Sequence, residues 1–75
     1  MIDQLAGLLG DVCGAPASTL KAESSPANTP GWDSVAMLTF IVAVEDSFGV
    51  TIATTEALGV KTLGDMARLV ERKKG

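Results

Sequence analysis

Hydrophobic residues recur at helical spacing near the start of the chain. Residues 2–13 read IDQLAGLLGDVC, and their larger apolar side chains are Ile2, Leu5, Leu8, Leu9 and Val12. This spacing predicts an amphipathic α-helix, because residues three and four positions apart share one helix face. Gly14 and Pro16 follow directly, and they predict the end of this first helix.

A stretch without helical or strand periodicity comes next. Residues 14–33 read GAPASTLKAESSPANTPGWD and contain all three prolines of the chain, so no long helix or strand is expected there. We expect Leu20 and Trp32 to anchor this loop on the core. A structureless loop of about 20 residues is uncommon in a compact domain unless it serves a function. The residues at its end therefore need an explanation.

A second helix is expected from about Ser34 to Phe48. A helical wheel gathers one set of apolar residues on the side that should face the core, namely Met37, Leu38, Ile41, Val44 and Phe48, with Val35 and Val42 flanking it and Phe40 at its other edge. The opposite side is a stripe of small or weakly polar residues, namely Ala36, Thr39, Ala43, Asp46 and Ser47. A helix that is apolar around its whole circumference is usually buried. In a small bundle it can instead be central on one side and hold a partner on the other.

Two further helices are expected in the last third of the chain. Val50 and Ile52 should be loop residues that pack inward, and a short helix should follow Thr54 or Thr55 and stop at Gly59. The last helix begins at TLGD, where Thr62 is the expected N-cap and Asp65 the acid three residues on. Its buried stripe is expected to be Leu63, Met66, Ala67 and Val70. We therefore expect residues 1–75 to form a single all-α domain, a four-helix bundle with a short third helix and a long loop between helices one and two.

The composition narrows the class of protein. Hydrophobic residues make up 47% of the chain and aromatic residues 4%, so the core must be mainly aliphatic. With one cysteine, Cys13, and no histidine, neither an internal disulfide nor a zinc site is expected. Cys13 should be a buried or half-buried hydrophobe, because no basic neighbour would lower its pKa. The residues MIDQLAGLLG lack the basic n-region of a secretory signal, and the longest apolar run is too short to span a bilayer. We therefore expect a free-standing, monomeric cytoplasmic protein.

Charge is distributed unevenly along the chain. Residues 1–60 hold seven acidic residues and a single lysine, whereas residues 61–75 hold five basic and two acidic residues. The acidic body disfavours nucleic acid, because phosphates would be repelled. The basic residues of the last helical turn oppose the negative end of the helix dipole.

Ser34 stands where the loop becomes a helix, and the residues allow two interpretations. Either Asp33 or Ser34 caps the helix by accepting a free backbone N–H. Alternatively, the Ser34 hydroxyl is exposed at the positive helix end, which would stabilise a phosphate bonded to it. A catalytic serine is disfavoured, because the chain has no histidine and the first lysine after Ser34 is Lys61.

Three motifs in this order carry a family resemblance. The segment GWDSV precedes the apolar helix, VEDSFGV ends it, and TLGD opens the last helix. This ordered set resembles the acyl carrier protein family over essentially the whole chain. The matching residues are Asp33, Ser34 and Val35 at the attachment motif, Glu45, Asp46 and Phe48 at the end of the second helix, and Ile52, Val60, Thr62 and Leu63 beyond it.

The resemblance implies that Ser34 carries a 4′-phosphopantetheine arm, transferred from coenzyme A by a separate phosphopantetheinyl transferase. The thiol of the arm would hold an acyl or aminoacyl group as a thioester. The protein would not be an enzyme itself. Its partners would be the transferase and acyl-loading or acyl-using enzymes such as ligases, acyltransferases and ketosynthases.

The expected docking surface for these partners lies mainly on the second helix. We expect it to comprise Asp33, Val35, Ala36, Thr39, Val42, Ala43, Glu45, Asp46 and Glu56. Carriers of primary fatty-acid synthesis typically have acids where this chain has Ala36 and Thr39. Since charge steers encounter and specificity, their loss favours a dedicated partner in polyketide, nonribosomal or other specialised biosynthesis. The alternative is a non-covalent helical interaction module in which Ser34 is only a cap and the small-residue stripe binds a partner helix.

Overall fold

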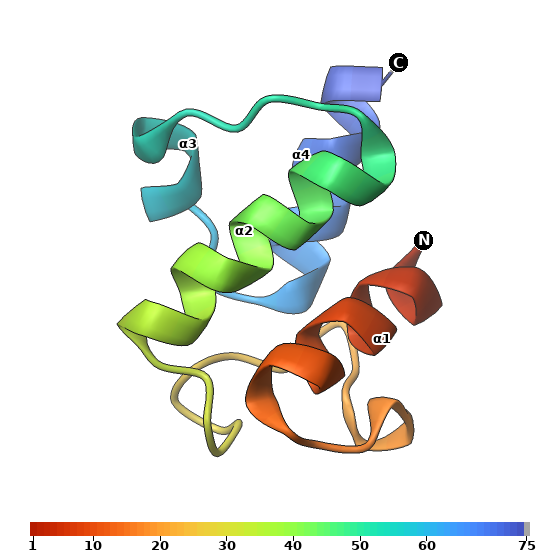
Figure 1. The fold of residues 1–75 in the computed structure, drawn as a ribbon, viewed down its shortest axis with the longest axis vertical. Helices are drawn as coiled ribbons and strands as arrows, with labels where there is room; N and C mark the ends of the chain where they lie inside the picture. Colours follow the sequence, from red (N-terminus) through yellow and green to blue (C-terminus); the bar gives the residue numbers. More distant parts are fainter. Residues whose placement is uncertain (75) are drawn as a thin grey trace.

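The structure is a computed structural model that describes residues 1–74. In this part of the chain it contains the helices α1 (Ile2–Cys13), α2 (Ser34–Phe48), α3 (Thr54–Leu58) and α4 (Leu63–Lys74), and the one-turn 3₁₀ helix η1 (Ala17–Thr19). Figure 1 shows α1 and α2 side by side and running in opposite directions, with α4 behind them and the short α3 at one edge. The predicted all-α fold with a short third helix is confirmed.

Local sequence signals set the helix ends. Gly14 and Gly49 adopt the left-handed conformation, with φ of 73° and 65°, and their N–H groups donate to the last turns of α1 and α2. Such a conformation ends a helix and favours glycine, which has no Cβ. At the start of α4, the Asp65 N–H donates to the Thr62 hydroxyl, and the Thr62 N–H donates to the Asp65 carboxylate. This is the predicted capping box.

The long loop is held at several points. Leu20 is 7% exposed and Trp32 is 3% exposed, which confirms both predicted anchors. Between them, the carbonyl oxygens of Ala22 and Ser24 accept hydrogen bonds from the first N–H groups of α4, at 2.8 and 2.9 Å. A Cβ on Gly64 would lie 3.1 Å from the Ala22 oxygen, so this close approach favours glycine.

The core is mainly aliphatic. Its fully buried side chains come from α1, α2 and α4, namely Leu5, Leu9, Phe40, Val44, Leu63, Met66 and Val70. The Trp32 ring meets Phe40 edge to face, with the ring centroids 6.0 Å apart. Ile52 is buried and Val50 packs against the core, as predicted for the loop before α3.

The predicted orientation of α2 is wrong in part. Phe40 is fully buried and Ala36 is 8% exposed, whereas Leu38, expected in the core, is 65% exposed. Val44 is buried as predicted. The helix is apolar nearly all round, so its periodicity did not distinguish the inner face. The edge contact of Trp32 with Phe40 and the packing against α1 turn the Ala36–Phe40–Val44 side inward.

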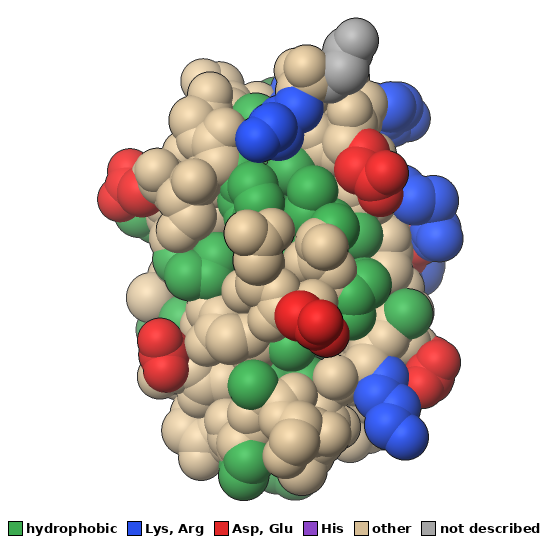
Figure 2. Space-filling view, turned by 90° about the vertical axis from the view of Figure 1, so that its right-hand side faces the viewer, with side chains coloured by type: hydrophobic (Ala, Val, Ile, Leu, Met, Phe, Trp, Pro, Cys, Tyr) green, Lys and Arg blue, Asp and Glu red, His purple; other side chains and the backbone are tan. Residues whose placement is uncertain are grey.

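Residues 1–74 contain no helix with both the length and the apolar character that a membrane crossing requires. Most, but not all, of the Lys and Arg side chains visible in Figure 2 lie toward the end of the molecule that holds the C-terminus, whereas acidic side chains are scattered over this face. Lys74 lies over the Phe48 ring at 5.6 Å from its centroid, which joins the ends of α4 and α2.

Candidate functional site

Ser34 is the first residue of α2, and its side chain is exposed. The neighbouring Asp33 is the N-cap, because its carboxylate accepts a hydrogen bond of 2.8 Å from the Ala36 N–H. Asp33 therefore performs the capping that the sequence left open between the two residues. The Ser34 hydroxyl is not needed for that purpose, and it stands at the positive end of a helix of 15 residues.

A groove begins at Ser34 and runs between α2 and α3. It has a volume of about 530 Å³ and is lined mostly by apolar side chains. Its lining residues from α2 and its start are Asp33, Ser34, Met37, Leu38 and Ile41, and those from the other side are Pro26, Thr54, Ala57, Leu58 and Val60. The groove could hold an apolar chain whose attached end is at Ser34.

Sequence reasoning missed this groove. Leu58 is a large aliphatic residue that is 76% exposed, and it belongs to a five-residue helix in which no residue is buried. A signal was present in the residues ALGV, positions 57–60, because so short a helix has little core to cover yet keeps large aliphatic residues. This signal does not predict which residues of α2 line the other side of the groove, because they depend on how α2 is rotated.

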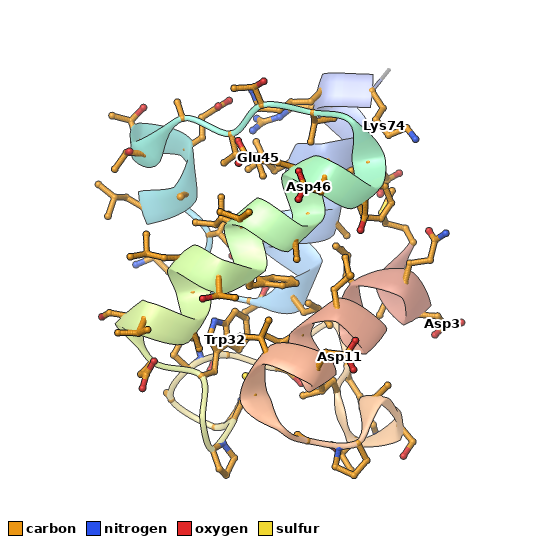
Figure 3. All side chains as sticks on the ribbon, in the orientation of Figure 1. Asp3, Asp11, Trp32, Glu45, Asp46 and Lys74 are labelled. Atoms are coloured by element: carbon orange, nitrogen blue, oxygen red, sulfur yellow. The ribbon has the colours of Figure 1, made fainter. Side chains whose placement is uncertain are left out.

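Trp32 supports the groove from beneath. Its indole N–H donates a hydrogen bond to the sulfur of Met37 at 3.3 Å. Met37 itself lines the groove, while Trp32 is buried in the core. The loop anchor and the groove wall are thus in direct contact; Figure 3 labels Trp32 below the first half of α2.

Most of the expected docking residues are exposed or half-buried, and Ala36 is buried. Val35 is 73% exposed and Val42 is 55% exposed, and Thr39 and Asp46 are also exposed. Ala43 is half-buried. The expectation that Ala36 belongs to the exposed stripe is wrong, because Ala36 is buried in the core cluster rather than facing solvent. The exposed Leu38 takes its place on this face of α2.

Besides Asp33, which caps α2, two further expected docking acids make internal contacts. The Glu45 carboxylate accepts a hydrogen bond of 2.8 Å from the Ile52 N–H. The Glu56 carboxylate accepts one of 2.9 Å from the Ala53 N–H and pairs with Lys73 at 2.8 Å. The Lys73 ammonium and the Ala53 N–H hold the pKa of Glu56 below its usual range. Asp46 lies exposed on α2, beside Glu45 in Figure 3.

Cys13 is half-buried at the end of α1, as predicted. Burial, and secondarily the negative charge of Asp33, raises the pKa of its thiol. A raised pKa leaves little thiolate at neutral pH, and the thiolate is the reactive form. Cys13 therefore behaves as a small hydrophobe below the loop that leads to Ser34.

The groove beside Ser34 has few ionisable side chains that could take part in bond-breaking chemistry. Among its lining residues the single ionisable side chain is Asp33, which is engaged as the cap of α2. An activated serine needs an adjacent base to take its proton. The site is suited to holding a group on an exposed hydroxyl and accommodating an apolar chain beside it.

Comparison with known proteins gives a consistent result. Residues 3–70 match the family described as the phosphopantetheine attachment site. An acyl carrier protein of Acidothermus cellulolyticus is 38% identical over 81% of this chain and 73% of its own length. Another, from Thermobifida fusca, is 29% identical over 96% of this chain and 91% of its own.

Solved structures agree with these relatives. The solution structure of a holo acyl carrier protein from Geobacter metallireducens superposes with a TM-score of 0.86 at 29% identity, covering 97% of this chain and 84% of that one. A holo acyl carrier protein from Nitrosomonas europaea gives a TM-score of 0.82 at 35% identity, covering 97% and 94%. The family match, the relatives and the shared fold show that this chain belongs to the acyl carrier proteins, which carry a covalently attached 4′-phosphopantetheine group.

Proposed function

We propose that Ser34 is the residue to which the 4′-phosphopantetheine group is attached. One observation carries this assignment. Asp33 caps α2, so the neighbouring Ser34 hydroxyl is left exposed beside the groove. The two residues also stand in the Asp-Ser motif that resembles the family's attachment sequence. A phosphate ester at this oxygen would lie at the positive end of α2, which stabilises negative charge.

The group would supply a terminal thiol, on which an acyl or aminoacyl cargo is held as a thioester. The protein's own residues would present and shelter it. Met37, Ile41 and Val60 offer an apolar surface beside the attachment point, and burial of alkyl carbons there is favourable by about 0.8 kcal/mol per CH₂. An aliphatic chain therefore fits the groove better than a charged one.

We further propose that the protein is a carrier without catalytic activity of its own. A phosphopantetheinyl transferase would attach the group, and ligases, acyltransferases or ketosynthases would load and use the cargo. Four of the exposed side chains of α2, namely Val35, Leu38, Thr39 and Val42, form the centre of the docking face in this proposal. The aliphatic character of this face supports a dedicated partner enzyme in a specialised pathway rather than a partner with a strongly basic docking face. The protein acts as a single-domain cytoplasmic monomer in this proposal.

Intact mass spectrometry tests the attachment site. Protein without the group is treated with a transferase of broad specificity and coenzyme A, and the mass should rise by one phosphopantetheine. Ser34→Ala should abolish the gain, whereas Ser47→Ala, which alters another exposed serine of the same helix, should leave it intact. Modification of the Ser34→Ala variant, or none in the wild type, would refute the assignment.

The alternative function is a non-covalent helical interaction module. It requires partner binding through α2 that is independent of Ser34. Pull-down of a cognate partner with the Ser34→Ala protein, together with an assay of acyl transfer, separates the two functions. A carrier loses acyl transfer when Ser34 is changed, whereas a non-covalent module keeps all of its partner binding. The capping role of Asp33 favours the carrier, since it removes the structural reason for a serine at position 34.

A further inference from the structure

The helix α3 forms one wall of the groove but has little packing of its own. None of its five residues is buried, although Thr54, Ala57 and Leu58 line the groove. Ala57 rests partly against the core cluster. In Figure 1, α3 lies at one edge of the bundle, and an extended loop runs to it from the C-terminal end of α2 along the top of the view. The position of α3 therefore depends on polar contacts as well as on the limited packing of Ala57.

Those contacts are two carboxylates that bind consecutive backbone N–H groups just before α3. Glu45 of α2 accepts from the Ile52 N–H at 2.8 Å, and Glu56 of α3 accepts from the Ala53 N–H at 2.9 Å. The same Glu56 oxygen pairs at 2.8 Å with the ammonium of Lys73, in the last turn of α4. The chain from α4 through Lys73 and Glu56 to Ala53 links α3 to a helix that buries six of its residues.

We propose that Lys73 is a positioning residue that, through Glu56, holds α3 against α2 and so determines how closely the groove encloses a chain attached at Ser34. The proposal rests on the proposed carrier function for its cargo part. It assigns the Lys73–Glu56 pair a role in cargo protection rather than in partner docking.

The geometry of the pair supports this role. The Lys73 and Glu56 side chains are 25% and 34% exposed, so solvent screens the pair less than it would two free surface charges. Lys74, the next residue, lies over the Phe48 ring and fixes the same end of α4 to α2. Lys73 thus extends from a segment that is itself held in place, which makes the pair a fixed tether.

Breaking the tether should loosen α3 without unfolding the protein. Neither the burial of Ile52 nor the hydrogen bond from its N–H to Glu45 involves Lys73, so we expect both to remain in a Lys73 variant. Loss of such a pair should change the opening equilibrium of α3 by about 1.5- to 5-fold. That range is measurable by amide hydrogen exchange, which reports local opening.

The first arm of the test uses the full chain without the attached group. Amide exchange of residues 53–58 is compared among the wild type, Lys73→Met, Lys73→Arg and Arg68→Met. Lys73→Met should accelerate exchange about 1.5- to 5-fold in this segment alone, and Lys73→Arg should restore the wild-type rate by keeping the charge. Arg68→Met is the matched control, because Arg68 pairs with Asp65 of its own helix. Equal exchange in the wild type and Lys73→Met would overturn the tether.

The second arm uses protein loaded with a butanoyl or an octanoyl thioester. Cleavage by hydroxylamine should be about 1.5- to 5-fold faster for the octanoyl form of Lys73→Met than of the wild type, with Lys73→Arg again normal. The butanoyl form, too short to extend far along the groove, should change less. Faster exchange in the first arm with unchanged octanoyl cleavage would refute the protective role. A failure to load any variant would count against the carrier function instead, while the exchange data would still decide the tether.

Discussion

The indole N–H of Trp32 donates a hydrogen bond to the sulfur of Met37, 3.3 Å away. Trp32 ends the long loop and is buried, whereas Met37 lines the groove beside Ser34. A soft, polarisable thioether adapts its shape to neighbouring groups. The contact makes the loop between α1 and α2 a support for the groove, in addition to being the path of the chain to the attachment serine.

This contact predicts a fluorescence signal for cargo. Trp32 is the single tryptophan of the chain. An octanoyl chain that enters the groove should shift Met37 and change the intensity or wavelength of Trp32 emission. The measurement compares protein with the bare attached group and with an octanoyl thioester on it. Met37→Leu, which removes the sulfur acceptor, should reduce the change, and identical spectra for both wild-type forms would contradict a groove-bound chain.

The observed rotation of α2 predicts that truncation of two large apolar residues lowers the free energy of unfolding by very different amounts. Phe40→Ala should lower the free energy of unfolding by about 3–5 kcal/mol, because it empties a fully buried site. Leu38→Ala should lower it by only about 0.5 kcal/mol or less, since that side chain is 65% exposed. Denaturant titration followed by circular dichroism measures both. Equal losses would mean that the helix is rotated otherwise.

The cap of α2 predicts a difference between the two residues of the attachment motif. Asp33→Ala should destabilise the protein by about 0.5–2 kcal/mol, because the Ala36 N–H loses its acceptor. Asp33→Asn keeps an acceptor oxygen and should cost less. Ser34→Ala should change the stability little, although it abolishes attachment. Thermal unfolding of the three variants checks this order, and a Ser34→Ala loss as large as that of Asp33→Ala would assign capping to the serine.

The carboxylates of Glu56 and Asp65 predict a pH dependence of stability. Lys73 and the Ala53 N–H lower the pKa of Glu56, and the Lys61 N–H is the main cause of the lowered pKa of Asp65. A lowered pKa in the folded state means that the ionised form stabilises the fold. This contribution is complete above the unfolded pKa values of about 4 and is lost as the pH falls through the lower folded values.

Glu56→Gln isolates one part of that dependence. Unfolding measured from pH 6 down to pH 2 should show a shallower loss of stability in this variant than in the wild type. Salt should weaken the wild-type effect, because part of it is the Lys73–Glu56 attraction. Parallel curves for both proteins would show that Glu56 has the same pKa folded and unfolded.

The exposed face of α2 predicts how partner choice can be changed. Ala36 is buried, so an acid there would disturb the core rather than alter docking. Thr39→Glu with Val42→Glu places acids on the exposed face instead. This double variant should be loaded faster by transferases with basic docking faces, and the gain should shrink at high salt. Equal loading rates at low salt would remove Thr39 and Val42 from the docking face.

The sequence alone determined the local features of this protein. Gly14 and Gly49 end helices because a left-handed residue interrupts the hydrogen-bond ladder, and Thr62 with Asp65 starts one because their side chains satisfy free N–H groups. These signals act over a few residues, so they can be read without the fold. The same holds for the position of Ser34 at the junction of loop and helix.

Only the tertiary structure decided which side of α2 faces the core and what surrounds Ser34. Nearly every side of α2 is apolar, so burial of Phe40 and exposure of Leu38 depend on Trp32 and α1, which reach it from other parts of the chain. The contacts of Glu45 and Glu56 likewise join α2, the loop and α4. Hydrophobic attraction is non-directional, and it leaves the choice among apolar faces to packing.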